Sequence, residues 1–431
     1  MDRSAEITIN LLEEVFSGNE STEVGVRLWN GTYWPDSNPR QTTLVLKHPG
    51  AFRRMFLPGN EVALAEVYLY DDFDVEGNLE SVFSLVDDLA IVAEDLPKRL
   101  RLGWSLLRLP RSNRRLSERR GPAHMSGEQH SIERDRQAIA YHYDVSNDFY
   151  ALWLDQRMVY SCAYFLTPEN SLDQAQVQKL EHICRKLRLR PGQRLLDIGC
   201  GWGGLVIYAA ERYGVEALGI TLSQPQADLA NERIAYAGLA DRCVVEVRDY
   251  REMNDTQGFD ALASVGMFEH VGESRVGTYF QQAWSLLRPG GFFLNHGITR
   301  RAIDPIRRGR SFSNEYVFPD GELTPISTSL HIAEEVGFEV RDVESLREHY
   351  AMTLRHWVQR LESHHDQALQ FVDEPTYRVW RLFMSGSANG FTNGRLNVHQ
   401  ALLVKPGPGG KSGLPITRAD LYSGNGGVKQ Q

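Results

Sequence analysis

Apolar residues recur along the second half of the chain in short runs that have the length of buried strands. These runs lie at residues 195–198, 216–221, 243–249, 259–265 and 291–299, and helix-like segments such as 205–213 and 224–236 separate them. Strands that alternate with helices at this spacing predict a parallel, doubly wound α/β sheet. The pattern continues with a helix over 326–336, a strand over 338–346, helical sequence over 349–383 and a closing strand over 397–404.

The first hundred residues have a different pattern. Their periodicity predicts helices over 7–16 and 79–91 and strands over 24–28 and 43–46. A length of 431 residues exceeds one typical domain. We therefore expect an N-terminal α+β domain (1–97), a linker (98–136), a catalytic domain (137–404) and a tail (405–431). Pro110, Gly121, Pro122 and Gly127 oppose a continuous helix in the linker, and the Gly, Pro and Ser content of the tail predicts disorder.

The charge of the chain reverses between the first domain and the linker. From Glu61 to Asp95 there are eleven Asp or Glu and no Lys or Arg, which favours a solvated acidic face over a cation site. Between Lys98 and Arg120 nine basic residues stand against one Glu and alternate with Leu and Trp. Such a segment suits an anionic membrane surface. It equally suits a flexible cationic linker or contact with the acidic first domain.

Composition excludes several classes of protein. With 42% hydrophobic and 24% charged residues the chain reads as a soluble globular protein, and a net charge of -9 argues against bulk attraction to nucleic acid. No run approaches eighteen apolar residues and the N-terminus lacks signal-peptide order, so we expect a cytoplasmic protein. The four cysteines, Cys162, Cys184, Cys200 and Cys243, lack zinc spacing, which predicts reduced thiols and no metal site.

The stretch RLLDIGCGWGG has the form of a nucleotide-binding strand, loop and helix. Glycines let the backbone approach a ligand, and the next helix directs its N-terminal amides toward it. Gly199, Gly201 and Gly204 satisfy G-x-G-x-x-G, which alone would suggest NAD. However, the following strand ends at Thr221 without the acid of a dinucleotide site, whereas Asp197 precedes the loop. This arrangement favours S-adenosylmethionine (SAM).

Eight motifs resemble those of one family, in the same order. They are HYDVSNDFY at 142–150, MVYSCAYF at 158–165, LLDIGCGWGG at 195–204, GITLSQPQ at 219–226, SVGMFEHVG at 264–272, LNHGI at 294–298, VFPDGELTP at 317–325 and HYAMTLRHW at 349–357. The chain resembles the cyclopropane-fatty-acyl-phospholipid synthase family, whose relatives include mycolic acid cyclopropane synthases and fatty-acid C-methyltransferases. The first domain resembles, less specifically, the N-terminal lipid-presenting region of that family.

The resemblance implies a Rossmann-like class I methyltransferase sheet with an antiparallel last strand. It also implies methyl transfer from SAM to a cis double bond of a phospholipid acyl chain. The resulting carbocation then loses a proton and closes a cyclopropane ring, with bound bicarbonate as the base. Such chemistry needs an apolar site that excludes water. The implied partners are unsaturated phospholipids at the inner face of the membrane, with peripheral association, and a homodimer is compatible with the sequence.

Two groups of residues follow from the resemblance position by position. The catalytic and bicarbonate group is Cys162, Glu269, His296, Ile298 and Tyr350, and the SAM group is Tyr160, Ser161, Gly199, Gly201, Thr221, Leu222, Gln226, Tyr250 and Arg251, to which the loop analysis adds Asp197. We expect Glu269 to pair with His296 and with the proton of bicarbonate. For Cys162 we favour a structural or anion-lining role over nucleophilic catalysis. Leu222 and Arg251 could instead be packing and surface residues.

Other functions stay open at this point. Transfer without ring closure would give a methylene- or methyl-branched chain, and relatives that share this core methylate amines at nitrogen. A non-catalytic lipid-binding protein is disfavoured, because Glu269, His296 and Tyr350 occur together.

Overall fold

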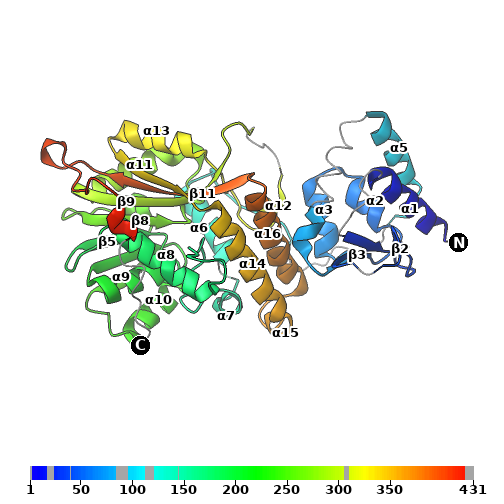
Figure 1. Cartoon of the computed structure of the whole chain (residues 1–431), viewed down its shortest axis with the longest axis horizontal. Helices are drawn as coiled ribbons and strands as arrows, with labels where there is room; N and C mark the ends of the chain where they lie inside the picture. Colours follow the sequence, from blue (N-terminus) through cyan, green and yellow to red (C-terminus); the bar gives the residue numbers. More distant parts are fainter. Residues whose placement is uncertain are drawn as a thin grey trace. The chain divides into compact units, whose positions relative to one another are not determined.

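The computed structural model describes residues 2–16, 24–38, 40–83, 96–111, 121–143, 145–304 and 310–422. The chain forms two compact units (Figure 1). Unit 1 combines Met1–Ala123, Arg308–Val317 and His365–Asn389, and unit 2 combines His124–Arg307, Phe318–His364 and Gly390–Gln431. Two segments of the region predicted to be catalytic therefore belong to the N-terminal unit, and the boundary lies near residue 123, inside the predicted linker.

Unit 1 contains a four-stranded sheet in the order β2-β1-β3-β4. Its strands are β1 (Val24–Arg27), β2 (Tyr33–Trp34), β3 (Thr42–Leu46) and β4 (Phe73–Glu76), and only β1 and β3 run parallel. The helices of its N-terminal part are α1 (Arg3–Phe16), α2 (Ala51–Phe56), α3 (Glu61–Leu69) and α5 (Leu96–Leu107). This confirms the predicted α+β class. Of the helix predicted over 79–91, residues 79–83 are helical and the rest lies outside the described residues.

Hydrogen bonds across long stretches of sequence attach the two later segments to unit 1. Arg378 of α16 (Glu374–Thr392), 8% exposed, donates to the carbonyl of Tyr68 at 3.0 Å. In α12 (Phe312–Tyr316) the hydroxyl of Tyr316 contacts the Glu66 carboxylate at 2.9 Å. The short helix α15 (His365–Ala368) precedes α16 in the sequence. Unit 1 is thus discontinuous in sequence because its helices and sheet are completed by residues from the far half of the chain.

The acidic stretch of unit 1 finds basic partners within the chain. The fully buried carboxylate of Asp72 contacts His48 at 2.6 Å and Arg54 at 2.5 Å. Asp71 and Asp74 each pair with Arg378 at 3.1 Å. The prediction of a solvated face is therefore wrong for the buried Asp72, whereas Asp71 and Asp74 stay partly exposed while paired with Arg378. Over the described ranges, no cluster of His, Cys, Asp and Glu could hold a metal ion.

Unit 2 is built on a seven-stranded sheet in the order β10-β11-β9-β8-β5-β6-β7. The strands are β5 (Arg194–Ile198), β6 (Glu216–Thr221), β7 (Cys243–Val247), β8 (Phe259–Val265), β9 (Leu287–Arg300), β10 (Glu339–Ser345) and β11 (Leu396–Val404). Strands β5 to β9 pair in parallel, and β11 runs antiparallel to both β9 and β10. This confirms the predicted doubly wound sheet with an antiparallel last strand.

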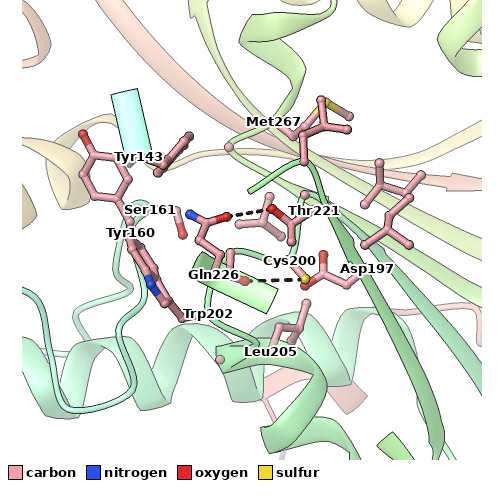
Figure 2. Close-up of a pocket in the computed structure, with 18 of the residues that line it drawn as sticks. Tyr143, Tyr160, Ser161, Asp197, Cys200, Trp202, Leu205, Thr221, Gln226 and Met267 are labelled. Carbon is pink, nitrogen blue, oxygen red and sulfur yellow. Dashed lines mark hydrogen bonds between the residues drawn. The ribbon is translucent and has the colours of Figure 1, made fainter. Parts of the chain in front are cut away.

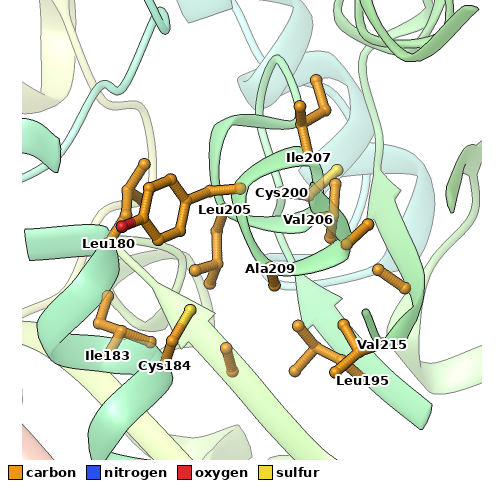
Figure 3. Close-up of a cluster of buried hydrophobic side chains, with 14 of the residues drawn as sticks. Leu180, Ile183, Cys184, Leu195, Cys200, Leu205, Val206, Ile207, Ala209 and Val215 are labelled. Carbon is orange, nitrogen blue, oxygen red and sulfur yellow. The ribbon is translucent and has the colours of Figure 1, made fainter. Parts of the chain in front are cut away.

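Helices cover both faces of this sheet (Figure 1). One face carries α8 (Leu172–Lys186), α9 (Gly204–Tyr213) and α10 (Gln224–Tyr236), and the other carries α11 (Val276–Leu286) and α13 (Ile326–Val336). Figure 3 shows Leu180 and Ile183 of α8 gathered with Leu205 of α9 near Leu195 of β5. The predicted capping box of Ser171 and Gln174 begins α8. These buried apolar contacts fix the strand ends that carry the site.

The remaining elements of unit 2 differ more from the predictions. Helix α6 (Ile132–Tyr143) begins inside the predicted linker, and α7 (Asn147–Ala151) follows it. The helical run predicted over 349–383 is interrupted, with α14 (Arg347–Ser363) ending before α15. None of the helices in the described part of the chain is long and apolar enough to cross a bilayer.

The predicted disorder of the tail is wrong for residues 405–422. Leu421 of α17 (Ala419–Tyr422) is buried, Arg418 pairs with Asp342 at 2.6 Å, and Asp420 pairs with Arg188 at 2.9 Å. Composition suggested too little burial to offset the entropy of ordering this segment. The buried side chain of Leu421 and the two ion pairs attach the end of this segment to unit 2. Residues 423–431 lie outside the described residues.

The contacts around β5 predict the stability of a core variant. Leu195→Ala removes a fully buried side chain, so we expect the free energy of unfolding to fall by about 2–5 kcal/mol. Val244→Ala on β7 is the matched control: Val244 is 45% exposed, and its loss should cost less than about 0.5 kcal/mol. Denaturant unfolding of the full chain measures both. Equal losses for the two variants would contradict the assigned core.

Candidate active site

The glycine-rich loop lies at the carboxyl end of β5. Gly199 has φ +80°, and a Cβ at this position would lie 2.7 Å from Cβ of Met267, so a larger residue does not fit. The amides of Gly199 and Cys200 donate to the carbonyl of Ile220 at 2.9 and 3.0 Å, which holds the loop against β6. The loop therefore presents its backbone to a cavity at the point where the strand order reverses.

One cavity of unit 2 brings together all ten residues predicted to bind the cofactor (Figure 2). They come from the segment before α8, the loop after β5, the end of β6 with the start of α10, and the 3-10 turn η1 (Tyr250–Glu252) after β7. Thr221 Oγ1 donates to Gln226 Oε1 at 2.7 Å, and both side chains are buried. The residues predicted from the sequence to bind the cofactor thus line a single cavity.

Arg251 lines this cavity, and its guanidinium forms ion pairs with two carboxylates. Its guanidinium pairs with Asp249 at 2.6 Å and with Asp135 of α6 at 2.8 Å, and it donates to the carbonyl of His130 at 2.9 Å. Arg251 is therefore not a plain surface residue. Its contacts with His130 and Asp135 hold the start of α6 at the rim of the cavity.

Aromatic rings form another part of the cavity wall. Tyr143 of α6 and Tyr160 line the cavity with ring centroids 6.0 Å apart, and Trp202 completes this side. Behind them, Trp357 lies 5.2 Å from the ring of Tyr160. Figure 2 shows Tyr143, Tyr160 and Trp202 together on one side, opposite Asp197. Such rings exclude water and interact favourably with a positive charge.

Two buried charged residues also line the cavity. Burial raises the pKa of Asp197 to about 7, and its Oδ1 has no hydrogen-bond partner. Lys179 of α8 is equally buried, donates to Ser161 Oγ at 2.9 Å, and has its pKa lowered by burial to about 8. Within the described residues no carboxylate forms an ion pair with Lys179. Together the two residues suit a ligand that carries both an ammonium and a carboxylate group.

Sequence analysis missed Lys179. The available signal was its position on α8, four residues from both the buried Ala175 and the buried Ile183, where an amphipathic helix places its apolar face. A lysine in that stripe must be buried, and a buried ammonium needs a polar or anionic partner.

Glu269 lies in the 3-10 turn η2 (Phe268–His270), next to the cavity residue His270. Its Oε1 accepts a hydrogen bond from the amide of Ile298 on β9 at 2.6 Å, whereas its Oε2 has no partner. Burial raises the pKa of Glu269 to about 7. This carboxyl group therefore has a free acceptor oxygen in a dry environment and a pKa near neutrality.

The predicted pairing of Glu269 with His296 is wrong. His296 Nδ1 instead contacts the amide nitrogen of Gln400 on β11 at 3.1 Å, and the buried Nε2 has no partner. Because that amide nitrogen donates to Nδ1, the ring proton lies on Nε2. Burial lowers the pKa of His296 well below its usual value, so the ring is neutral at pH 7. Nε2 is thus an unused hydrogen-bond donor.

Tyr350 interacts electrostatically with both Cys162 and Glu269. Burial raises the pKa of Tyr350 well above its usual value, and the nearby Glu269 carboxylate raises it further, so its hydroxyl stays protonated. Burial likewise raises the pKa of the Cys162 thiol, and its Sγ donates to the carbonyl of Ala163 at 3.2 Å. A protonated, buried thiol is a poor nucleophile. This agrees with a structural or anion-lining role.

The predicted catalytic group therefore supplies complementary polar atoms. Glu269 Oε2 can accept one hydrogen bond, and His296 Nε2 and the Tyr350 hydroxyl can each donate one. His296 and Ile298 are two residues apart on β9 and face the same side of the strand. Together these groups offer one hydrogen-bond acceptor and two donors.

The chain is similar to one family model and to several curated proteins. Residues 130–401 match the family model described as mycolic acid cyclopropane synthetase. A probable fatty acid methyltransferase of Pseudomonas putida is 41% identical over 402 residues, covering 92% of this chain and 95% of that protein. The cyclopropane-fatty-acyl-phospholipid synthase of Escherichia coli (strain K12) is 36% identical over 281 residues, covering 64% of this chain and 69% of that protein.

Solved structures also resemble the chain. Mycolic acid cyclopropane synthase CmaA1, in complex with SAH and CTAB, is 33% identical with a TM-score of 0.59, and the match covers 62% of this chain and 97% of that chain. Coclaurine N-methyltransferase, at 21% identity and a TM-score of 0.55, shows the same fold. Its structure also contains SAH. These findings support a SAM-dependent methyltransferase.

Lys179 generates a prediction about how the cavity recognises SAM. We expect Lys179→Met to weaken SAM binding at pH 7 by about tenfold or more, because a charge-assisted hydrogen bond to the methionine carboxylate is worth roughly 1.5–3 kcal/mol. Binding of decarboxylated SAM should change little. Isothermal titration of both ligands to both proteins measures this difference.

The pH dependence supplies the control for this prediction. Since the pKa of Lys179 is about 8, its ammonium is lost as pH rises through that value, and SAM affinity of the unmodified chain should fall there. Lys179→Met should lack this fall. An equal loss of affinity for the two ligands would show that the variant has only damaged the cavity.

Proposed function

The chain belongs to the mycolic acid cyclopropane synthetase family, and on this premise we propose that it methylates a cis double bond of an unsaturated phospholipid acyl chain and closes a cyclopropane ring. SAM-dependent lipid methylation is the coarser activity of that family. The observation that carries the finer proposal is the buried Glu269, whose free Oε2 lies in a dry region beside the cavity. Ring closure requires that a base remove one proton from the acyl chain. The Glu269 carboxylate can hold such a base by accepting a hydrogen bond from it.

The proposed reaction has two stages. The π electrons of the alkene attack the methyl carbon of SAM, a C–C bond forms, and the S–CH3 bond breaks to leave S-adenosylhomocysteine and a carbocation. A proton then leaves the added methyl group, and the electrons of that C–H bond close the ring. Tyr143, Tyr160 and Trp202 support both stages, because aromatic faces stabilise the cation and keep out water that would capture it.

The proposed base is a bound bicarbonate, and the unpartnered Glu269 Oε2 and His296 Nε2 support this choice. Glu269 Oε2 would accept its proton, and His296 Nε2 and the Tyr350 hydroxyl would donate to its oxygens. Bound there, bicarbonate would supply a base that competes weakly as a nucleophile. The chain's own contribution is to keep Glu269 ionised and oriented through the Ile298 amide, with His296 held neutral as a donor.

Methyl transfer without ring closure is the second candidate. The names of two relatives favour it: the probable fatty acid methyltransferase of Pseudomonas putida, and tuberculostearic acid methyltransferase UfaA1 of Mycobacterium tuberculosis, which is 32% identical over 390 residues. A 1,2-hydride shift would move the positive charge to the methylated carbon, and loss of a proton from the methyl group would then form a C=CH2 bond, leaving a methylene branch. A methyl branch would also require a hydride donor.

Product analysis tests the proposed reaction. We expect the purified chain, given SAM, bicarbonate and vesicles of cis-monounsaturated phospholipid, to add one CH2 per modified acyl chain with loss of the double bond. Mass spectrometry measures the added mass, and ozonolysis reports whether an alkene survives. A gain of one CH2 with an ozone-sensitive product would instead establish the methylene branch. No transfer to lipid would contradict both candidates.

Glu269→Gln tests the role of the carboxylate. We expect turnover to fall at least about hundredfold, because the amide cannot accept in the same way, while SAM affinity changes less than about twofold. Since the active form is the carboxylate and its pKa is about 7, activity of the unmodified chain should rise as pH increases through 7 and then level off. The variant should lack that rise.

Glu273→Gln is the matched control for this experiment. Glu273 follows Glu269 closely in sequence, and its carboxylate lies 3.6 Å from Arg300. We expect this substitution to leave turnover and the pH profile unchanged. The assignment of Glu269 would be wrong if its variant retained full turnover across bicarbonate concentrations.

A further inference from the structure

Helix α5 of unit 1 is held firmly by one of its faces. Leu106 is buried, and so is Leu109 just beyond the end of the helix. Arg53 of α2 donates to the carbonyls of Leu107 and Leu109 at 2.9 and 2.8 Å, and Arg101 pairs with Glu14 of α1 at 2.5 Å. These contacts fix which side of α5 faces outward.

The outward face of α5 carries a row of large apolar side chains. Leu100 is 67% exposed, Trp104 is 72% exposed and Leu107 is 52% exposed. At about 100° per residue, their spacing of four and three positions places all three within a sector of about 60°. Exposed apolar residues normally occur singly, and a contiguous row of them marks an interaction site. We call these three residues the apolar row.

Basic residues flank the apolar row. Arg101 and Arg108 project about 60° and 40° beyond Trp104 on the helical wheel, and Arg108 and Arg111 are both exposed near the end of the helix. In the part of the chain that the structure describes, neither Arg108 nor Arg111 forms an ion pair with a carboxylate. The outer face of α5 therefore combines a tryptophan and two leucines with available positive charge.

We propose that α5 docks the chain on an anionic lipid bilayer. The apolar row enters the boundary between headgroups and acyl chains, and Arg108 and Arg111 contact lipid phosphates. Amphipathic helices with tryptophan and leucine on one side and arginine beside them bind membrane interfaces in this way. The inference rests on the proposed function, because an enzyme acting on phospholipid chains needs repeated, reversible contact with the bilayer.

A second copy of the chain is a less suitable occupant. In a two-fold contact the apolar row would meet itself and bring the arginines of both copies together. A lipid surface supplies the opposite charge along the whole helix. Sedimentation velocity distinguishes these occupants, because an interface between copies would change the oligomeric state when the row is removed.

Vesicle flotation tests the proposal with the full chain. The vesicles contain phosphatidylcholine and phosphatidylglycerol with saturated chains in the fluid state, so no double bond is present and binding is measured without turnover. We expect Leu100→Gln, Trp104→Gln and Leu107→Gln together to reduce vesicle binding at least about tenfold at low and high salt. Arg108→Ser with Arg111→Ser should weaken binding mainly at low salt.

Two exposed residues elsewhere provide matched controls. Tyr236 is 97% exposed and Ile416 is fully exposed, but neither belongs to the apolar row. Tyr236→Ser with Ile416→Ser should leave vesicle binding unchanged. SAM affinity and thermal unfolding of the triple variant should match the unmodified chain, which would show that its fold is intact.

Two results would overturn the proposal. One is vesicle binding by the triple variant equal to that of the unmodified chain, and the other is a shift in oligomeric state with binding unchanged. Failure of the proposed reaction appears differently, as normal vesicle binding without lipid methylation. The two experiments therefore report on α5 and on the chemistry separately.

Discussion

The hydrogen bond from the Ile298 amide to Glu269 is the interaction on which the catalytic group depends. It joins the turn after β8 to strand β9, and a second bond from the Gly266 amide to the His296 carbonyl, at 2.9 Å, joins the same two elements. Both bonds require β9 to keep its register. That register is fixed by parallel pairing with β8 and by antiparallel pairing with β11 from Leu396 to Val404. Sheet pairing thus places a buried carboxylate where its second oxygen stays available.

The two groups of site residues differ in how they are positioned. The SAM group lies on loops after parallel strands, where the topology itself collects residues from distant parts of the sequence. The catalytic group instead depends on individual hydrogen bonds, of Glu269 with Ile298 and of His296 with Gln400. Tyr143 connects the two groups. It lines the cavity that contains the SAM group, and its pKa is raised mainly by burial and further by the charge of Glu269 in the catalytic group.

This difference explains what the sequence could predict. Apolar runs predicted where strands β5 to β11 lie along the chain, because the central strands of such a sheet are buried on both faces. The SAM residues followed from the motifs at the strand ends. The partners of Glu269 and His296 could not follow, because a hydrogen bond between side chains depends on geometry finer than strand order. Lys179 was missed for a related reason: its role comes from burial, which single residue types do not reveal.

Unit 1 is built from segments that lie far apart in the sequence, and this affects how the chain folds. Arg378 bonds to Tyr68, 310 residues earlier, and Gly386 approaches Phe83. The N-terminal unit therefore cannot be completed when its first hundred residues leave the ribosome. Until α16 has been synthesised, Asp71 and Asp74 lack their partner Arg378, and the apolar surface that α16 covers stays exposed. In a growing polypeptide, the unit that begins first is among the last to finish.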